Sequence, residues 1–277
     1  MADAAAAAAN RHYAVGLARA FAGAIIFSLP LLMTMEMWWL GFYLDRFRLI
    51  QFALVNFVVL VGLSRVAGFE ETHSRIEDVL DAFAAYAVAV LASAAILLLL
   101  GVIGPGMAPA EIAGKVAIQA VPASFGAMIA GKQLGAADKI EKAEERWRST
   151  YVGQLYLMLA GALFLSFNVA PTEEMVLIAY QMTPWHGLVL VLLSIASLHA
   201  VVFSVGFAGQ EKGHAGGFLA TIVHYTLAGY GIAVLVSLYV LWTFGRTEGL
   251  DGPQIAMMVA VLAFPGAIGA AIARLVV

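Results

Sequence analysis

Eight long apolar runs constrain the fold of this 277-residue chain more than any other feature. Each is near the ~20 residues that an α-helix needs to cross a lipid bilayer. They cover residues 14–43, 48–66, 80–103, 113–131, 151–181, 185–207, 217–244 and 254–275. Charged residues make up only 12% of the chain, about half of the roughly 25% found in soluble domains. The sequence therefore predicts an all-α, polytopic membrane protein with eight transmembrane helices.

The second half of the chain resembles the first with few gaps. Residues 13–37 match residues 151–175 at an offset of 138, and later segments match at offsets of 144 and 143. The matches that mean most in so apolar a chain are Tyr13/Tyr151, Ser28/Ser166, Glu36/Glu174, Tyr86/Tyr230, Ser93/Ser237, Pro122/Pro265 and Gly126/Gly269. Four spans return a chain to its starting side, so the pattern predicts a parallel four-plus-four repeat about an axis along the membrane normal.

This repeat sets the expected domain organisation. We expect a flexible N-terminal tail over residues 1–12, because six alanines follow Met-Ala-Asp there without the basic region of a signal peptide. The first four-helix repeat covers 13–131 and the second covers 151–277. Residues 132–150 are the one extended polar run, and its Glu and Lys spacing is typical of an exposed helix. It predicts a charged cytosolic linker.

The lysines and arginines predict the orientation of the chain, because cytoplasmic loops are enriched in them. The N-terminus and every second loop after it carry 11 of the 15, and the opposite loops carry 4, namely Arg46, Arg48, Lys115 and Arg246. This distribution places both termini in the cytoplasm. Trp38 and Trp39 then belong to an aromatic belt at the outer interface, where we expect Lys115 to snorkel to the surface.

A matched pair of carboxylates gives the main functional hypothesis. Glu36 and Glu174 lie late in the first and fifth runs, and matched hydroxyl residues come before them: Ser28 and Thr34 before Glu36, and Ser166 and Thr172 before Glu174. An ionised acid inside a bilayer is costly, so such acids usually face a cavity or take part in transport. If both face the repeat axis, they form a two-carboxylate ring that attracts cations or exchanges protons.

The alternative is that both acids lie in the outer headgroup region. The first run holds about 30 residues, some 45 Å of helix, against a hydrocarbon core of ~30 Å. Glu36 comes late in that run, beside the tryptophans. Pro30 and Pro171 can each break or kink a helix near these acids, and a broken helix beside an acid is typical of ion sites.

The loop after the second run is acidic. Glu70, Glu71, His73, Glu77 and Asp81 fall within it. His73 and Glu77 share one helix face if this segment is helical, as do Glu77 and Asp81, so the loop predicts either a cytosolic metal or partner site or a solvated acidic surface. Asp81 could also be a first-turn acid of the third span.

Further candidates among the polar side chains inside the apolar runs are Asn56, His199 and His224. A buried histidine or asparagine commonly bonds to a neighbouring helix, and a proton relay is the alternative. The two histidines have no counterparts in the other half of the chain, which favours local bonding.

Several classes of function are disfavoured. The chain has no cysteine, and its net charge of −3 gives no basic surface for nucleic acid. It contains no H-E-x-x-H, Walker or G-x-S-x-G motif. We therefore expect a protein that is not an enzyme and that carries no cofactor or resident metal.

The run Phe27-Ser-Leu-Pro-Leu-Leu-Met-Thr-Met-Glu36-Met-Trp-Trp-Leu-Gly resembles an uncommon family of bacterial integral membrane proteins without an assigned function. The resemblance covers most of the chain from about Arg11. It implies a location in the bacterial inner membrane, and it carries over no catalytic residue.

Two functions remain open at this point. One is a channel or transporter-like protein that passes cations, protons or a small solute and has Glu36 and Glu174 near an outer vestibule. The other is a non-transporting scaffold, stress or assembly factor that acts through the acidic loop and the 132–150 linker. The expected partners are the lipid bilayer, a cation or small solute, and a second copy of the chain in a homodimer.

Overall fold

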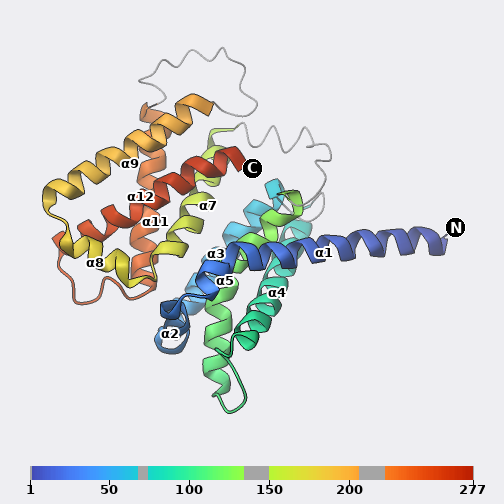
Figure 1. The fold of residues 1–277 in the computed structure, drawn as a ribbon. Helices are drawn as coiled ribbons and strands as arrows, with labels where there is room; N and C mark the ends of the chain where they lie inside the picture. The colour runs from blue at the N-terminus through green and yellow to red at the C-terminus, as the bar shows by residue number, and fades with distance from the viewer. Residues whose placement is uncertain (1, 68–73, 134–149, 206–221, 277) are drawn as a thin grey trace. The chain divides into compact units, whose positions relative to one another are not determined.

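The computed structural model describes residues 2–67, 74–133, 150–205 and 222–276. Within these ranges the regular structure is helical, without strands. The helices in chain order are α1 (Ala2–Leu32), α2 (Met35–Tyr43), α3 (Arg46–Ala67), α4 (Arg75–Leu99), α5 (Pro109–Gln133), α7 (Tyr151–Val169), α8 (Glu173–Gln181), α9 (Pro184–Val205), the π-helix η1 (Ile222–Leu227), α11 (Ala228–Thr243) and α12 (Gly252–Val276) (Figure 1).

Eight segments of the described residues are helices long and apolar enough to cross a membrane. They are Ala14–Leu32, Arg46–Arg65, Arg75–Leu99, Pro109–Ala130, Tyr151–Val169, Pro184–Val202, Ile222–Thr243 and Gly252–Ala273. Large apolar side chains such as Leu54 and Val58 are exposed on these helices, as expected where a helix faces lipid rather than water. The predicted all-α fold with eight membrane-spanning helices is confirmed.

Two of the predicted spans end earlier than expected. The run 14–43 is divided between α1 and α2, and the run 151–181 between α7 and α8. Each second piece has nine residues, about 14 Å of helix, which is too short to cross a bilayer. The reason lies in Thr34 and Thr172, which take the extended backbone conformation of a helix N-cap despite the apolar residues around them.

The N-terminal segment also differs from expectation. Residues 2–12, for which we expected a flexible tail, form the first turns of α1. Alanine has the highest helix propensity of the amino acids, so a run of six alanines continues the helix backwards from the first span. Their side chains lie outside the described part of the structure.

The chain divides into two compact units, Met1–Lys139 (unit 1) and Ile140–Val277 (unit 2). In unit 1 the helices α1, α2, α3 and α4 all contact α5, whose spanning segment is largely buried. Gly23 and Gly126 lie where α1 crosses α5, and a Cβ at Gly126 would overlap the carbonyl oxygen of Gly23. Small residues that let helix backbones touch are a common basis of packing in membranes.

Unit 2 has the same order of elements. Its central helix is α12, which contacts α7, α8, α9 and α11. Gly161 and Gly269 lie where α7 crosses α12, and a Cβ at Gly269 would overlap the carbonyl oxygen of Gly161. The loops before α5 and α12 each contain two glycines with positive φ, Gly101 and Gly106 in unit 1 and Gly245 and Gly249 in unit 2, a conformation that only glycine adopts without strain.

Candidate functional site

Hydrogen bonds at the break between α1 and α2 fix the position of the short helix α2. The last carbonyl groups of α1 lack partners within the helix, and side chains satisfy three of them. The Thr34 hydroxyl donates to the Pro30 carbonyl, the Gln119 amide to the Leu31 carbonyl at 2.9 Å, and the Trp38 indole N–H to the Leu32 carbonyl at 2.8 Å. These bonds join α2 and α5 to the end of α1.

A close crossing holds α2 against α5. A Cβ at Gly114 would overlap the carbonyl oxygen of Gly41, and a Cβ at Gly41 would lie against the backbone of Lys115. The two glycines therefore let the backbones touch. As a result the aromatic side chains of α2 lie beside the first turns of α5.

A cavity of about 560 Å³ lies at this end of unit 1. It is lined by Trp38, Trp39, Phe42, Leu100, Gly101, Val102, Glu111 and Lys115, and we call it the unit 1 cavity. Trp38 also packs against the buried cluster of Leu32, Leu97, Ile103 and Val116. Cavities of this size that combine apolar walls with a few polar groups are typical of small-molecule sites.

The polar part of the cavity is an ion pair. Lys115 Nζ lies 2.7 Å from Glu111 Oε1, and the two side chains are 12% and 24% exposed. The ammonium group also donates to the Val102 carbonyl at 3.4 Å. Both residues lie in the first two turns of the span Pro109–Ala130, where a charge that is removed from water without a partner is costly. Pairing lowers that cost and keeps both charges beside the cavity.

Sequence reasoning placed Lys115 at the outer surface and did not select Glu111. The structure instead gives Lys115 a mostly buried side chain with a carboxylate partner one turn away. The i,i+4 spacing of Glu111 and Lys115 is itself a signal for such a pair on a helix.

In unit 2, different side chains form the hydrogen bonds at the break between α7 and α8. The Thr172 hydroxyl donates to the Val169 carbonyl at 2.8 Å, but the other partner is an arginine. Arg246 Nη1 lies 3.1 Å from Glu173 Oε1, and its Nη2 donates to the Pro171 carbonyl. The unit therefore holds α8 in place through the loop between α11 and α12.

A smaller cavity of about 230 Å³ lies between the start of α12 and the end of α8. It is lined by Ala179, Tyr180, Met182, Pro184, Pro253, Gln254, Met257 and Met258, and we call it the unit 2 cavity. The repeat offset of 143 pairs Glu111 with Gln254 and Lys115 with Met258. None of the residues lining this cavity is charged.

The structure does not put Glu36 or Glu174 among the residues that line either cavity. Glu36 is half-buried in the first turn of α2, four residues after the span that ends at Leu32, and Glu174 is exposed in the first turn of α8. Acids in a first turn interact favourably with the helix dipole. Each acid therefore lies beyond the end of a spanning segment, in a short helix of its own unit.

Of the four matched hydroxyl residues, Ser28 and Ser166 are fully buried inside their units. The Ser28 hydroxyl donates to the Ala24 carbonyl of its own helix. Ser166 Oγ has no hydrogen-bond partner among the described residues and lies next to Gly266 of α12. Thr34 and Thr172 occupy the N-cap positions but bond back to the preceding helix, as described above.

The acidic loop lies largely outside the described residues, since these exclude Glu70, Glu71 and His73. Glu77 forms a capping box with Ser74 at the start of α4, and Asp81 is half-buried one turn later. Within the described residues, no group of three or more His, Cys, Asp or Glu side chains could hold a metal ion.

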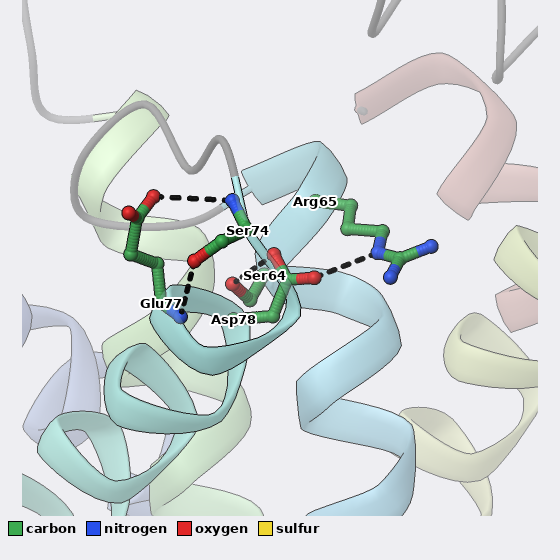
Figure 2. Close-up of polar contacts among 5 residues, drawn as sticks. All are labelled: Ser64, Arg65, Ser74, Glu77 and Asp78. Carbon is green, nitrogen blue, oxygen red and sulfur yellow. Dashed lines mark hydrogen bonds and ion pairs between the residues drawn. The ribbon is translucent and has the colours of Figure 1, made fainter.

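The residue that sequence reasoning missed here is Asp78. Its carboxylate is buried, with a side chain 4% exposed, and its Oδ2 accepts from Arg65 Nε at 2.8 Å, while Ser64 Oγ lies 3.5 Å from Oδ1 (Figure 2). The Arg65 side chain is 45% exposed, and its guanidinium faces Asp78 through Nε while its two terminal nitrogens make no drawn contact with the other labelled residues (Figure 2). This pair ties the end of α3 to the start of α4.

The intramembrane polar residues make local bonds. The Asn56 amide donates to Tyr86 Oη at 2.8 Å and to Ser124 Oγ at 2.9 Å, which joins α3 to α4 and α5. His199 Nδ1 lies 2.9 Å from Thr226 Oγ1 of η1. His224 is exposed, and its backbone carbonyl accepts from Tyr151.

Eight apolar helices, two of them followed by a short helix after a break, define a polytopic helical membrane protein. Residues 16–277 match the model of the family described as "Putative integral membrane protein (DUF2391)", and the chain belongs to that family. The resemblance to an integral membrane protein family is thus confirmed. No curated protein matches the chain, and no solved structure does.

Proposed function

We propose that this protein is transporter-like, with no enzymatic activity, and that it passes a small solute or ion whose entry point is the unit 1 cavity. The observation that supports this most is the Lys115–Glu111 pair, which lies in a spanning helix and lines the cavity. Ionisable residues inside membrane spans commonly mark substrate or ion pathways.

The broken helices give further support. Transporters commonly build their sites from discontinuous helices, because backbone and helix ends freed by a break can bind solutes. In unit 1 the break at Met33 and Thr34 is followed directly by the helix that supplies three aromatic residues to the cavity. The Gly41–Gly114 crossing holds this helix against α5, so its aromatic residues stay beside Glu111 and Lys115.

We further propose that the two units are parallel copies in a bacterial inner membrane, with both termini in the cytoplasm. The shared order of elements and the glycine crossings at matched positions support the duplication. The distribution of lysines and arginines supports the orientation. In this arrangement α2 and α8 face the periplasm, and Glu36 and Glu174 add negative charge there that attracts cations. The homodimer remains a prediction.

Flux measurements on full-length protein in liposomes test the proposal. The panel contains rubidium, protons, tetramethylammonium, acetate and trimethylglycine. The test variant is Glu111→Gln/Lys115→Met, which gives unit 1 the residues that unit 2 has at the matched positions. The control is Gln254→Leu/Met258→Leu in unit 2. We expect a flux that the test variant loses and the control keeps.

A flux that the test variant leaves unchanged contradicts the unit 1 cavity as the entry point. No flux above empty liposomes, from protein shown to be folded, contradicts transport altogether and favours the scaffold hypothesis, whose predicted surfaces lie mainly outside the described residues. A third variant, Glu36→Gln/Glu174→Gln, shows whether the matched acids contribute: reduced cation flux places them on the path.

A further inference from the structure

We propose that the ligand of the unit 1 cavity is a small zwitterion, a molecule that carries an ammonium group and a carboxylate or phosphate group. This inference rests on the proposed function, because it names the class of solute that the same cavity takes. Three properties of the cavity lead to it: its internal charge balance, its aromatic wall and its contrast with unit 2.

The charge balance is the first property. Lys115 and Glu111 neutralise each other at 2.7 Å, and both side chains are mostly buried. A ligand with a single charge can pair with only one member, so it competes with the other member and adds an uncompensated charge beside two mostly buried side chains. A zwitterion provides a carboxylate or phosphate for Lys115 and an ammonium group for Glu111, so it brings no net charge into the cavity.

The aromatic wall favours one kind of cation. Trp38, Trp39 and Phe42 all come from α2 and line the cavity together with Glu111. Aromatic ring faces attract cations, and a cavity that combines several rings with a carboxylate is the usual recognition site of quaternary ammonium groups. Methylated ammonium groups also have apolar surface, which suits a cavity whose other walls are Leu100 and Val102.

The position of Trp38 strengthens this assignment. Its indole N–H already bonds to the Leu32 carbonyl at 2.8 Å, so the indole enters the cavity with its own donor satisfied. Trp39 and Phe42 are 57% and 62% exposed. They can therefore close over a ligand without first leaving a buried position. The rings offer apolar contact and cation–π attraction, while Lys115 and Glu111 supply the charge recognition.

Unit 2 provides a built-in comparison. Its cavity has less than half the volume and replaces the ion pair by Gln254 and Met258, and its only aromatic lining residue is Tyr180. The same argument therefore predicts no zwitterion site there. Any binding should follow one site per chain, and it should depend on unit 1 residues alone.

This chemistry has two sources. One is a soluble zwitterion such as trimethylglycine. The other is the zwitterionic headgroup of phosphatidylethanolamine, whose ammonium group is not methylated and therefore offers Glu111 and the rings charge without the apolar surface of methyl groups. The cavity lies where three spans end, next to exposed apolar residues such as Leu100, so both can reach it. The two sources are separated by testing soluble and lipid ligands in different membranes.

The experiment uses the full-length protein in nanodiscs made only of phosphatidylglycerol, which contain no zwitterionic lipid. Calorimetry compares trimethylglycine with tetramethylammonium and with acetate, which carry one charge each. Short-chain phosphatidylethanolamine is then added while tryptophan fluorescence is recorded. We expect a zwitterion, soluble or lipid, to bind at one site per chain and about tenfold or more tightly than either single-charge compound.

The variants Glu111→Gln/Lys115→Met and Trp39→Leu should each weaken this binding about tenfold or more, and Gln254→Leu/Met258→Leu should not. Thermal unfolding of each variant confirms that it is folded. Binding of trimethylglycine identifies a soluble ligand, and binding of the lipid alone identifies a headgroup.

The inference is overturned if neither zwitterion binds, or if tetramethylammonium or acetate binds as tightly. Its failure is distinct from failure of the proposed function. A flux of rubidium or acetate that depends on Glu111 and Lys115 would leave the transport proposal intact and remove the zwitterion. A zwitterion that binds without any flux would support the zwitterion site and contradict the transport proposal.

Discussion

Unit 1 and unit 2 use the same order of helices and differ most where the short helices α2 and α8 meet the central helices α5 and α12. In both units a pair of glycines lets the first helix touch the central one, Gly23 with Gly126 and Gly161 with Gly269. In unit 1 the side chains of Gln119 and Trp38 donate hydrogen bonds to the carbonyl groups at the end of α1. In unit 2 Arg246 donates to the Pro171 carbonyl between α7 and α8. The packing of the bundle is shared, and the chemistry at its end is not.

The difference shows which positions are constrained by packing. A residue at a backbone crossing has no room for change, because any added atom separates two helices. A residue that lines a cavity at the end of the bundle can change from Lys to Met without moving a helix. Both units accordingly have glycines where the first helix crosses the central one, whereas Glu111 and Lys115 of unit 1 stand opposite Gln254 and Met258 of unit 2 at the sequence offset of 143.

The largest expected effect concerns the shared glycines. Gly126→Ala and Gly269→Ala should each destabilise the protein by about 3 kcal/mol, the upper end for overpacking, because the new Cβ meets backbone that cannot rotate away. Denaturation of purified protein in mild detergent measures this. Gly16→Ala and Gly231→Ala are matched controls, since among the described residues no atom outside the adjacent helix backbone lies within 4 Å of a Cβ built at either position. Equal effects at crossings and controls would contradict the shared packing.

A smaller effect is expected at the ion pair. Glu111→Gln alone should cost about 2 kcal/mol, because it leaves the mostly buried Lys115 ammonium without its carboxylate. The double variant Glu111→Gln/Lys115→Met should be close to neutral, since buried ion pairs can be replaced by uncharged residues at little cost. Unfolding curves of the single and double variants give the coupling. A double variant less stable than the single one would show that the uncharged residues of unit 2 cannot replace the ion pair of unit 1 without loss of stability.

The Arg65–Asp78 pair has no counterpart among the described residues of unit 2, and its two members should respond unequally to substitution. Arg65→Gln should cost about 1–2 kcal/mol, because it removes the ion-pair partner of a buried carboxylate. Asp78→Asn should cost less, since the Arg65 side chain is 45% exposed and can turn to solvent. Chemical denaturation of both variants tests the order, and the reverse order would mean that Arg65 contributes little.

The smallest effect is expected at the two matched threonines. Thr34→Val and Thr172→Val each remove one hydroxyl-to-carbonyl hydrogen bond at a helix break, which is worth about 0.5–1 kcal/mol. Equal losses in both units would show that the breaks are equivalent. A loss confined to one unit would show that Gln119 and Trp38, or Arg246, already hold that break without the threonine.

The number and order of the spans could be predicted from the sequence, because eight apolar runs separated by polar segments leave few alternatives in a bilayer. Pro171 lies in the break between α7 and α8, where the sequence allowed one, but Pro30 stays inside α1 and the chain breaks after Leu32. Thr34 before Glu36 and Thr172 before Glu173 are the usual signs of an N-cap and an acidic first turn. The continuous apolar composition of each run concealed these signs.

The candidate site was harder to predict. The sequence predicted Glu36 and Glu174 as site residues because they are acids in apolar runs, yet each lies beyond the end of a span. Glu111 and Lys115 looked like ordinary residues near a helix start, and only the fold brings Trp38, Trp39 and Phe42 beside them. The cavity depends on the close crossing of Gly41 with Gly114. The hydrophobic periodicity of the sequence does not predict which distant residues come into contact in this way.

The most direct test of the account is cysteine labelling at Phe42 and Tyr180, which are matched positions that line the two cavities. The chain has no cysteine of its own, so Phe42→Cys and Tyr180→Cys each provide one reactive thiol. Intact cells are treated with a membrane-impermeant maleimide. The account predicts that both positions are labelled from outside, because parallel units put α2 and α8 on the same side of the membrane. Labelling of the two positions from opposite faces would contradict it.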